Sequence, residues 1–213
     1  MDEQTLKRII TLAAIKQLAL AGERYIPAAV SARHVHLCAA DIEALFGKGH
    51  SLVKMRDLMQ PGQYACEEQV TLVGKKGRIE KIRVLGPARR ETQIEIPVTD
   101  CYKAGFEPVV RMSGDLDNTP GGTLIGPAGE VTLSKGVIVA ARHLHATVEQ
   151  AGWYGLKNGD IVSVKKQGVR ETVFGNIVVR TGPDHDLELH LDPDEANAAG
   201  IKSSDMLELV KGG

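Results

Sequence analysis

The chain has 213 residues, with 26 Lys and Arg against 27 Asp and Glu and a formal net charge of -1. This length suits one large domain or two small ones with a hydrophobic core, which excludes a disordered chain. The balanced charge leaves no overall basic field for nucleic acid or an anionic membrane, so we expect neither as a partner and expect any anionic ligand to be held by a local cluster.

Residues 1–22 predict an amphipathic N-terminal helix. Asp2 can cap it, Leu6, Ile9 and other apolar residues recur at helical spacing, and Gly22 can end it. Its apolar stripe can pack on the body of the protein, on a second copy in a homodimer, or on another protein that receives short amphipathic helices. We favour the first two and expect a homodimer.

The rest of the chain predicts a mainly β protein. Only 4% of the residues are aromatic and 23 are Gly, which is typical of many turns and short elements. Alternating runs rich in Val, Ile and Thr predict strands at 69–73, 79–85, 92–98, 136–141, 161–165, 173–179 and 187–191. Short helices are expected at 41–46, 147–151 and 194–199, and the Gly-, Pro- and Asp-rich segment 112–129 predicts a long loop or linker.

An internal repeat predicts the architecture. Residues 31–36 read Ser-Ala-Arg-His-Val-His, and residues 140–145 read Ala-Ala-Arg-His-Leu-His. Each motif is followed by a helical turn and a strand-rich block that ends in Gly-Pro. We therefore expect two similar small β-barrel domains, since closure removes the exposed edges of short strands.

The two His-x-His motifs predict metal sites. Residues two apart in a strand share a face, so His34 and His36 project together, as do His143 and His145. Zinc and related metals take three or four protein ligands, and the best additional candidates are Glu95 and His190, each in an alternating strand downstream. The alternative is a solvated polar face, which two copies in a repeat make less attractive. His50 and His185 lie in turn-like sequence and are expected at the surface.

Arg89 and Arg90 follow the turn Gly86-Pro87 and enter a strand. Guanidinium groups bind phosphate through paired hydrogen bonds, so this turn predicts an anion clamp; the alternative is an exposed basic turn. The sequence has no nucleotide-binding glycine loop and no Gly-x-Ser-x-Gly elbow. Ser113 is interpreted as a turn residue.

The cysteines are Cys38, Cys66 and Cys101, an odd count without a Cys-x-x-Cys pair, which indicates a reducing compartment. Cys38 follows the first His-x-His and could be a spare ligand, although a buried apolar role is preferred. The N-terminal segment is interrupted by charges and lacks a cleavage site, and no stretch of about 20 uncharged apolar residues occurs. We expect a cytoplasmic protein.

These motifs together resemble the phosphate propanoyltransferases, the phosphotransacylases of propanediol-utilising bacterial microcompartments. The resemblance runs from about Tyr25 to the end and is carried by residues 30–37, 85–89 with 92–95, 141–145, and 188–190 with 194–197. It implies two β-barrels with the active site between them, two zinc ions, and conversion of acyl-CoA (propanoyl-CoA or acetyl-CoA) plus phosphate into acyl phosphate plus CoA. The N-terminal helix is, in some relatives, a peptide that docks to the microcompartment shell.

The resemblance also implies domain bounds and residue roles. The N-terminal helix would span 1–22, the first barrel 33–140, and the second barrel 23–32 plus 141–213. His34, His36 and Glu95 would hold one zinc, His143, His145 and His190 the other, and Arg89 would be the catalytic arginine that binds phosphate. Positions that contact CoA are matched by Arg83, Leu85 and Asn197.

Two rival functions stay open at this point. A metal-dependent phosphoester or thioester hydrolase could use the same paired metals with water as the attacking group. A non-catalytic binding module with structural histidines would bind metal without turnover, but it would not explain why Arg89 is placed beside the site.

Overall fold

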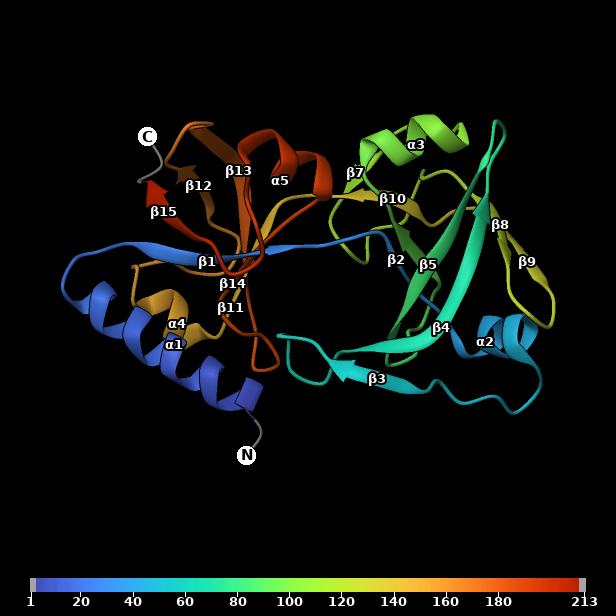
Figure 1. Cartoon of the computed structure of the whole chain (residues 1–213), viewed down its shortest axis with the longest axis horizontal. Helices are drawn as coiled ribbons and strands as arrows, with labels where there is room; N and C mark the ends of the chain where they lie inside the picture. Colours follow the sequence, from blue (N-terminus) through green and yellow to red (C-terminus); the bar gives the residue numbers. More distant parts are fainter. Residues whose placement is uncertain (1–2, 211–213) are drawn as a thin grey trace. The chain divides into compact units, whose positions relative to one another are not determined.

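The computed structural model describes residues 3–210, with side chains described from Leu6 onward. The chain forms two compact units (Figure 1). Unit 1 contains the residues up to Val30, Arg142–Leu191 and the residues from Glu195 onward, and unit 2 contains Ser31–Ala141 and Asp192–Asp194. Asp2, expected to cap the first helix, lies outside the described residues.

Unit 1 is built on a closed barrel. In order around the barrel its strands are β1 (Tyr25–Val30), β14 (Glu188–Leu191), β11 (His143–Ala146), β13 (Thr172–Thr181), β12 (Ile161–Lys166) and β15 (Met206–Val210). Strands alternate buried apolar residues with more exposed ones, as in β12, where Val162 and Val164 enter the core. The closure of this barrel leaves none of these six strands with an open edge.

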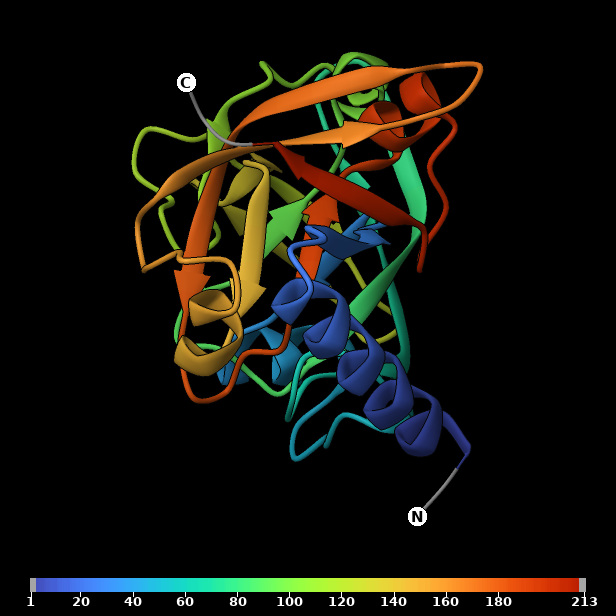
Figure 2. The ribbon, with the colours of Figure 1, turned by 90° about the vertical axis from the view of Figure 1, so that its left-hand side faces the viewer.

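Three helices belong to unit 1: α1 (Glu3–Leu20), α4 (Val148–Gly152) and α5 (Pro193–Ala199), whose first residues lie in the segment assigned to unit 2. Helix α4 begins where the sequence predicts, because the Thr147 hydroxyl accepts a hydrogen bond from the backbone nitrogen of Gln150. Figure 2 shows α1 running along the outside of the barrel.

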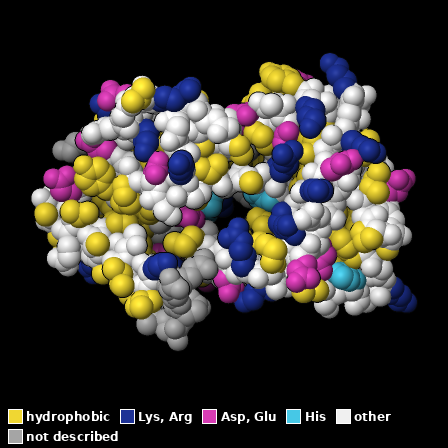
Figure 3. All heavy atoms as spheres, viewed as in Figure 1, with side chains coloured by type: hydrophobic (Ala, Val, Ile, Leu, Met, Phe, Trp, Pro, Cys, Tyr) yellow, Lys and Arg dark blue, Asp and Glu magenta, His cyan; other side chains and the backbone are white. Residues whose placement is uncertain are grey.

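The N-terminal helix α1 buries one face and exposes another. Ile15 is buried in the barrel core, with Leu12 and Ala19 packed against it. Arg8 forms an ion pair with the buried Asp186, which fastens the helix to the barrel. The other face exposes Leu6, Ile9, Ile10, Leu18 and Leu20. Hydrophobic side chains are accordingly visible over α1 at the lower left of Figure 3.

Unit 2 is built on a nine-stranded sheet. Its path is β7 (Val110–Arg111), β10 (Val137–Ala140), β6 (Gln93–Glu95), β2 (His34–His36), β5 (Arg78–Gly86), β4 (Tyr64–Val73), β8 (Gly122–Ile125) and β9 (Glu130–Leu133), with β3 (Lys54–Asp57) paired to β4. Helices α2 (Ala39–Phe46) and α3 (Val98–Ala104) complete it. The prediction of a mainly β fold with short helices is confirmed.

Two expectations for unit 2 need correction. The segment 112–129 is not only a loop, because Gly122–Ile125 forms β8 and pairs with both β4 and β9. The close packing there requires glycine: a Cβ on Gly121 would lie 2.0 Å from the carbonyl oxygen of Leu133. The expected strand 92–98 ends at Glu95, and Val98 begins the helix α3.

Among the described residues, no helix is both long enough and apolar enough to cross a membrane.

Candidate functional site

Each His-x-His motif is the central strand of a three-strand arrangement, and the two arrangements have the same pattern. In unit 2, β2 lies between β5, which is parallel to it, and β6, which is antiparallel. In unit 1, β11 lies between β13, parallel, and β14, antiparallel. The repeat seen in the sequence is therefore a repeat of sheet topology.

The middle residue of each motif fixes which way the histidines point. Val35 and Leu144 are 0% and 1% exposed and lie in the hydrophobic cores of their units. Because neighbouring residues in a strand face opposite sides, burying the middle residue turns both flanking histidines to the other side. The alternation of His and an aliphatic residue thus creates a pair of imidazoles on one face.

The strand register brings a third side chain to each pair. Glu95 on β6 lies opposite His34, and His190 on β14 lies opposite His143. As a result, one potential ligand atom from each of His34, His36 and Glu95 lies within 4.8 Å of the others, and the same holds for His143, His145 and His190. The structure therefore brings together all six residues that the sequence predicted, as two groups of three.

The donor sets fit metal ions. Nδ1 of His36 and Nδ1 of His145 are buried and have no hydrogen-bond partner among the described residues. A buried ring nitrogen without a partner is costly, and coordination of a cation would satisfy it. Sets of three nitrogen and carboxylate donors match zinc and related divalent cations.

The protonation of the histidines supports the same reading. Burial, reinforced by the nearby charges of His34 and Arg89, holds the pKa of His36 well below its usual range. Burial also lowers the pKa of His145, with His190 and His143 adding to the effect. Both rings are therefore neutral at pH 7, which is the form that binds metals.

His34 differs because it lies against an acid. Burial acts to lower the pKa of His34, but the Glu95 carboxylate, whose Oε2 is 3.5 Å from Nε2, and the hydrogen bond to Ala32 together outweigh burial and raise the pKa. The Nδ1 of His34 donates a hydrogen bond of 2.8 Å to the carbonyl oxygen of Ala32. This bond orients the ring and directs Nε2 toward Glu95.

Arg89 lies beside the unit 2 histidines. Its backbone nitrogen donates to the carbonyl oxygen of Leu37, one residue after the first motif. Its guanidinium acts to lower the pKa of both His34 and His36, which places its charge close to the cluster. The Nη1 of Arg89 donates to the Ser113 hydroxyl at 3.1 Å. The predicted anion clamp is therefore a partly buried arginine next to a candidate metal site.

Gln93 and Ser113 connect Arg89 to Glu95, a role that the sequence did not predict for either residue. The Gln93 amide nitrogen donates to the Ser113 hydroxyl at 2.8 Å and to the Glu95 carboxylate at 2.6 Å. The Ser113 oxygen thus receives hydrogen bonds from both Gln93 and Arg89. A signal was available: Gln93 alternates with Glu95 in one strand, so the two share a face.

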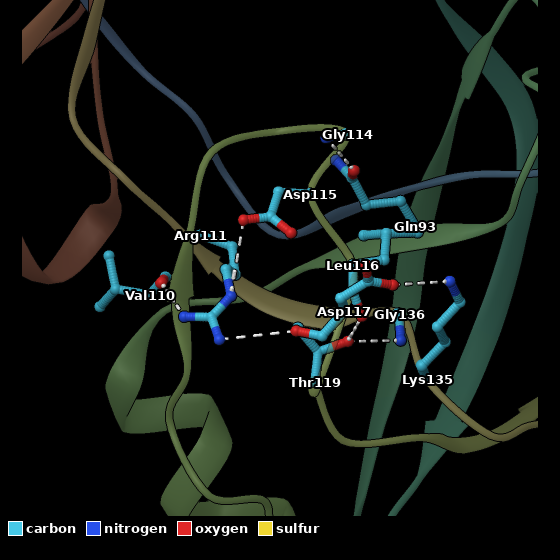
Figure 4. A network of polar contacts seen from close by, with 10 residues as sticks. All are labelled: Gln93, Val110, Arg111, Gly114, Asp115, Leu116, Asp117, Thr119, Lys135 and Gly136. Carbon is cyan, nitrogen blue, oxygen red and sulfur yellow. Dashed lines mark hydrogen bonds and ion pairs between the residues drawn. The ribbon is translucent and has the colours of Figure 1, made fainter.

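Ser113 belongs to the loop between β7 and β8, and Figure 4 shows polar contacts made by neighbouring residues of this loop. The Gly114 backbone nitrogen donates to Gln93 Oε1 at 2.7 Å, and the Thr119 hydroxyl donates to the carbonyl oxygen of Leu116 at 2.7 Å. Further contacts along the loop are the ion pairs of Arg111 with Asp115 and of Lys135 with Asp117. The turn role expected for Ser113 is therefore incomplete, since its side chain faces the Arg89 site.

The arginine that precedes each His-x-His motif forms an ion pair with a residue of a helix. Arg33 forms an ion pair of 3.2 Å with Asp100 of α3, and Arg142 forms one of 2.5 Å with Glu195 of α5. Asp100 lies five residues after Glu95, and Glu195 lies five residues after His190. The repeated arginine therefore links the motif to the helix that follows the strand of the third ligand.

The residues matched to CoA contacts lie on two elements, β5 and α5. Arg83 on β5 is half-buried and donates to the carbonyl oxygens of Cys66 and Glu67 at 3.0 and 2.9 Å. Leu85 lies two residues further along the same strand, and Asn197 is an exposed residue of α5 in unit 1. Arg90, which follows Arg89, is exposed.

The two histidines expected at the surface are only partly exposed. His50 stacks on Phe46 and hydrogen-bonds through Nε2 to Glu68 at 2.7 Å. The His185 ring lies 4.3 Å from that of His145, centroid to centroid, and its Nδ1 donates to the carbonyl oxygen of Arg180 at 3.0 Å. His185 therefore packs against the second histidine cluster, because the turn that carries it folds back on β13.

Comparison with known proteins gives a consistent result. The family model described as phosphate propanoyltransferase matches residues 27–202. The chain is 50% identical over 183 residues to the phosphate propanoyltransferase of Thermotoga maritima, covering 85% of this chain and 87% of that protein. It is 50% identical over 186 residues to that of Rhodobacter capsulatus, covering 87% and 86%, and 42% identical over 223 residues to that of Rhodopseudomonas palustris, covering 99% of both. The family match includes both histidine clusters and Arg89.

Proposed function

The chain belongs to the phosphate propanoyltransferase family, and from this we propose that it is a phosphotransacylase that interconverts acyl-CoA plus phosphate with acyl phosphate plus CoA. The structural observation that carries the proposal is the Arg89 guanidinium beside the His34, His36 and Glu95 cluster. An anion-binding group next to a candidate cation site is what the transfer of an acyl group from a thioester to phosphate requires.

We propose that phosphate binds at Arg89. The guanidinium can offer two parallel N–H groups to two phosphate oxygens, and the hydrogen bond to Ser113 restricts its rotation. Phosphate is already anionic at neutral pH, so no base has to activate it. The contribution of Arg89 is therefore alignment and charge neutralisation, each of which can supply several kcal/mol in a site shielded from water.

The transfer then proceeds directly from CoA to phosphate. A phosphate oxygen attacks the thioester carbonyl, the new carbon–oxygen bond forms, and the carbon–sulfur bond breaks to release the CoA thiolate. No acyl-enzyme is needed. The buried thiols of unit 2, Cys66 and Cys101, have their pKa raised to about 11 by burial, which makes them poor nucleophiles.

The two histidine clusters would each hold one divalent cation, which we propose to be zinc. His34, His36 and Glu95 would hold one ion, and His143, His145 and His190 the other. When bound, such a cation polarises a carbonyl oxygen and stabilises a departing thiolate. The burial of both clusters limits access of water, which would otherwise compete with phosphate for the thioester.

Propanoyl-CoA and acetyl-CoA are both proposed substrates. They differ by one methylene group, whose burial contributes about 0.8 kcal/mol, or about a fourfold ratio in kcat/KM. Arg83, Leu85 and Asn197 are proposed to contact CoA. Arg83 would do so with those of its N–H groups that do not serve the carbonyl oxygens of Cys66 and Glu67.

The test is a CoA-release assay with and without phosphate, before and after treatment with a chelator. The proposal expects release that depends on phosphate and falls on removal of metal. Release at the same rate without phosphate would identify a hydrolase instead. A ping-pong kinetic pattern with an isolable acyl-enzyme would refute direct transfer.

We also propose that the exposed apolar face of α1 serves assembly, either in a homodimer or in docking to the shell of a bacterial microcompartment. Leu6, Ile9 and Ile10 are 44%, 51% and 59% exposed on this face. Light scattering on the full chain and on a chain lacking residues 1–20 tests the homodimer, and co-purification of both chains with shells tests the docking.

A further inference from the structure

Gln93 and Glu188 occupy equivalent positions in the two units. Gln93 lies opposite His36 in the pairing of β2 with β6, and Glu188 lies opposite His145 in the pairing of β11 with β14. Each lies two residues before the third member of its cluster, Glu95 or His190, and therefore shares a face with it. Both are well buried, at 2% and 8% exposure.

Each of these residues makes a hydrogen bond to the third member of its cluster. The Gln93 amide nitrogen donates to the Glu95 carboxylate at 2.6 Å. In unit 1 the direction is reversed: the His190 Nε2 donates to the Glu188 carboxylate at 2.8 Å. An amide therefore accompanies the carboxylate ligand of unit 2, and a carboxylate accompanies the imidazole ligand of unit 1.

This exchange has a chemical reason. A carboxylate that binds a cation has oxygens that accept hydrogen bonds, so an amide N–H is a suitable neighbour. An imidazole that binds a cation through one nitrogen has an N–H on the other, and a carboxylate that accepts from it orients the ring and increases its basicity. A carboxylate in place of Gln93 would instead face Glu95 as a like charge.

We propose that Gln93 and Glu188 are equivalent positioning residues, each matched to the third ligand of its own metal site. The inference rests on the proposed metal sites. With Glu188 bonded to Nε2, His190 presents Nδ1 to the ion, and with Gln93 bonded to one oxygen, Glu95 is held toward the two histidines of its cluster.

Gln93 has a second role, which follows from its contacts with Ser113 and Gly114. Its amide nitrogen also donates to Ser113, which accepts from Arg89. Its amide oxygen accepts from the Gly114 backbone at 2.7 Å. One side chain therefore holds both the carboxylate of the metal cluster and the loop that orients Arg89, so a change at Gln93 should disturb both sites in unit 2.

The test measures zinc binding by the full chain in competition with a chromophoric chelator. Outer hydrogen-bond partners of metal ligands typically change affinity by about 10- to 100-fold. We expect Glu188→Gln, which keeps the size but not the charge, to lower the affinity for one of the two zinc ions by that factor. Gln93→Glu should lower the affinity for the other ion and also raise the KM for phosphate. The controls Glu208→Gln in unit 1 and Gln167→Glu should leave both affinities unchanged.

The assignment of each ion uses a His143→Ala background. In that background, Gln93→Glu should still lower the affinity for the remaining zinc ion, while Glu188→Gln should leave this affinity unchanged. The far-ultraviolet circular dichroism spectrum of each chelated variant should match that of the chelated parent, which shows that the variant is folded and separates positioning from folding. If Glu188→Gln does not fold, Glu188→Asp, which shortens the reach by one carbon, should weaken the same ion.

The failures can be told apart. A parent chain that binds no zinc refutes the metal sites and this inference with them. A parent that binds two ions, with both variants binding them within twofold of the parent, refutes only the positioning roles of Gln93 and Glu188.

Discussion

Replacing Arg89 by Lys tests whether phosphate binds through a paired contact. Lysine keeps the charge but loses the planar fork, so one of two hydrogen bonds to phosphate disappears. A hydrogen bond to a charged group contributes about 1.5–3 kcal/mol, which corresponds to about a 10- to 150-fold fall in kcat/KM for phosphate. Lysine also leaves Ser113 without the hydrogen bond of 3.1 Å from Arg89 Nη1.

The assay follows CoA release at varied phosphate and saturating acyl-CoA, with metal content measured on the same samples. Metal content should be unchanged, because Arg89 is not a member of either histidine cluster. Arg78→Lys is the matched control, since Arg78 is an exposed arginine of the same unit that pairs with Glu80. A kcat/KM for phosphate within twofold of the parent would show that Arg89 does not bind phosphate. A parallel loss of metal would show that Arg89 acts through the metal cluster of unit 2.

Three further predictions concern the second cluster, the core and the thiols. His143→Ala should lower the metal content from two ions to one by elemental analysis, because it removes one of three ligands; full metal content with full activity would make the histidine a bystander. Leu144→Ala should reduce the free energy of unfolding in urea by about 2–5 kcal/mol, because this side chain is 1% exposed in the core, whereas the exposed Val148→Ala should change it little. Burial raises the pKa of Cys66 and Cys101 to about 11, so at pH 8 only about one in a thousand is a thiolate and only Cys38 should react with Ellman's reagent in the folded protein. Rapid reaction of three thiols without denaturant would contradict their burial.

The local pattern of the sequence was sufficient to predict the six residues of the two clusters, but it did not predict that His185 packs against the second cluster. The alternation of His with Val35 or Leu144 fixes the face of each imidazole, and the alternation around Glu95 and His190 fixes the third side chain. These features depend on residues two apart in the chain, so they can be recognised without knowledge of the fold. Whether the six side chains bind zinc stays a prediction.

The contacts around Arg89 could not be predicted in the same way. Ser113 reaches Gln93 because its loop is fixed by polar contacts with Arg111, Asp117 and Lys135, which are specified by geometry and not by a periodic pattern. The strand β8 was missed because it begins in a Gly-rich segment that resembles a linker. The helix α3 was missed because Val98 and Thr99 are β-branched and favour strands by propensity.

The order of strands in the closed barrel has a consequence for biosynthesis. The strand β1 pairs with β14 and β15, so its hydrogen-bonding partners are translated more than 150 residues after it. Unit 2, by contrast, is almost a continuous stretch from Ser31 to Ala141. On the ribosome, the sheet carrying the first histidine motif can therefore form early, while Tyr25–Val30 has to wait, unpaired, until the final strand has emerged.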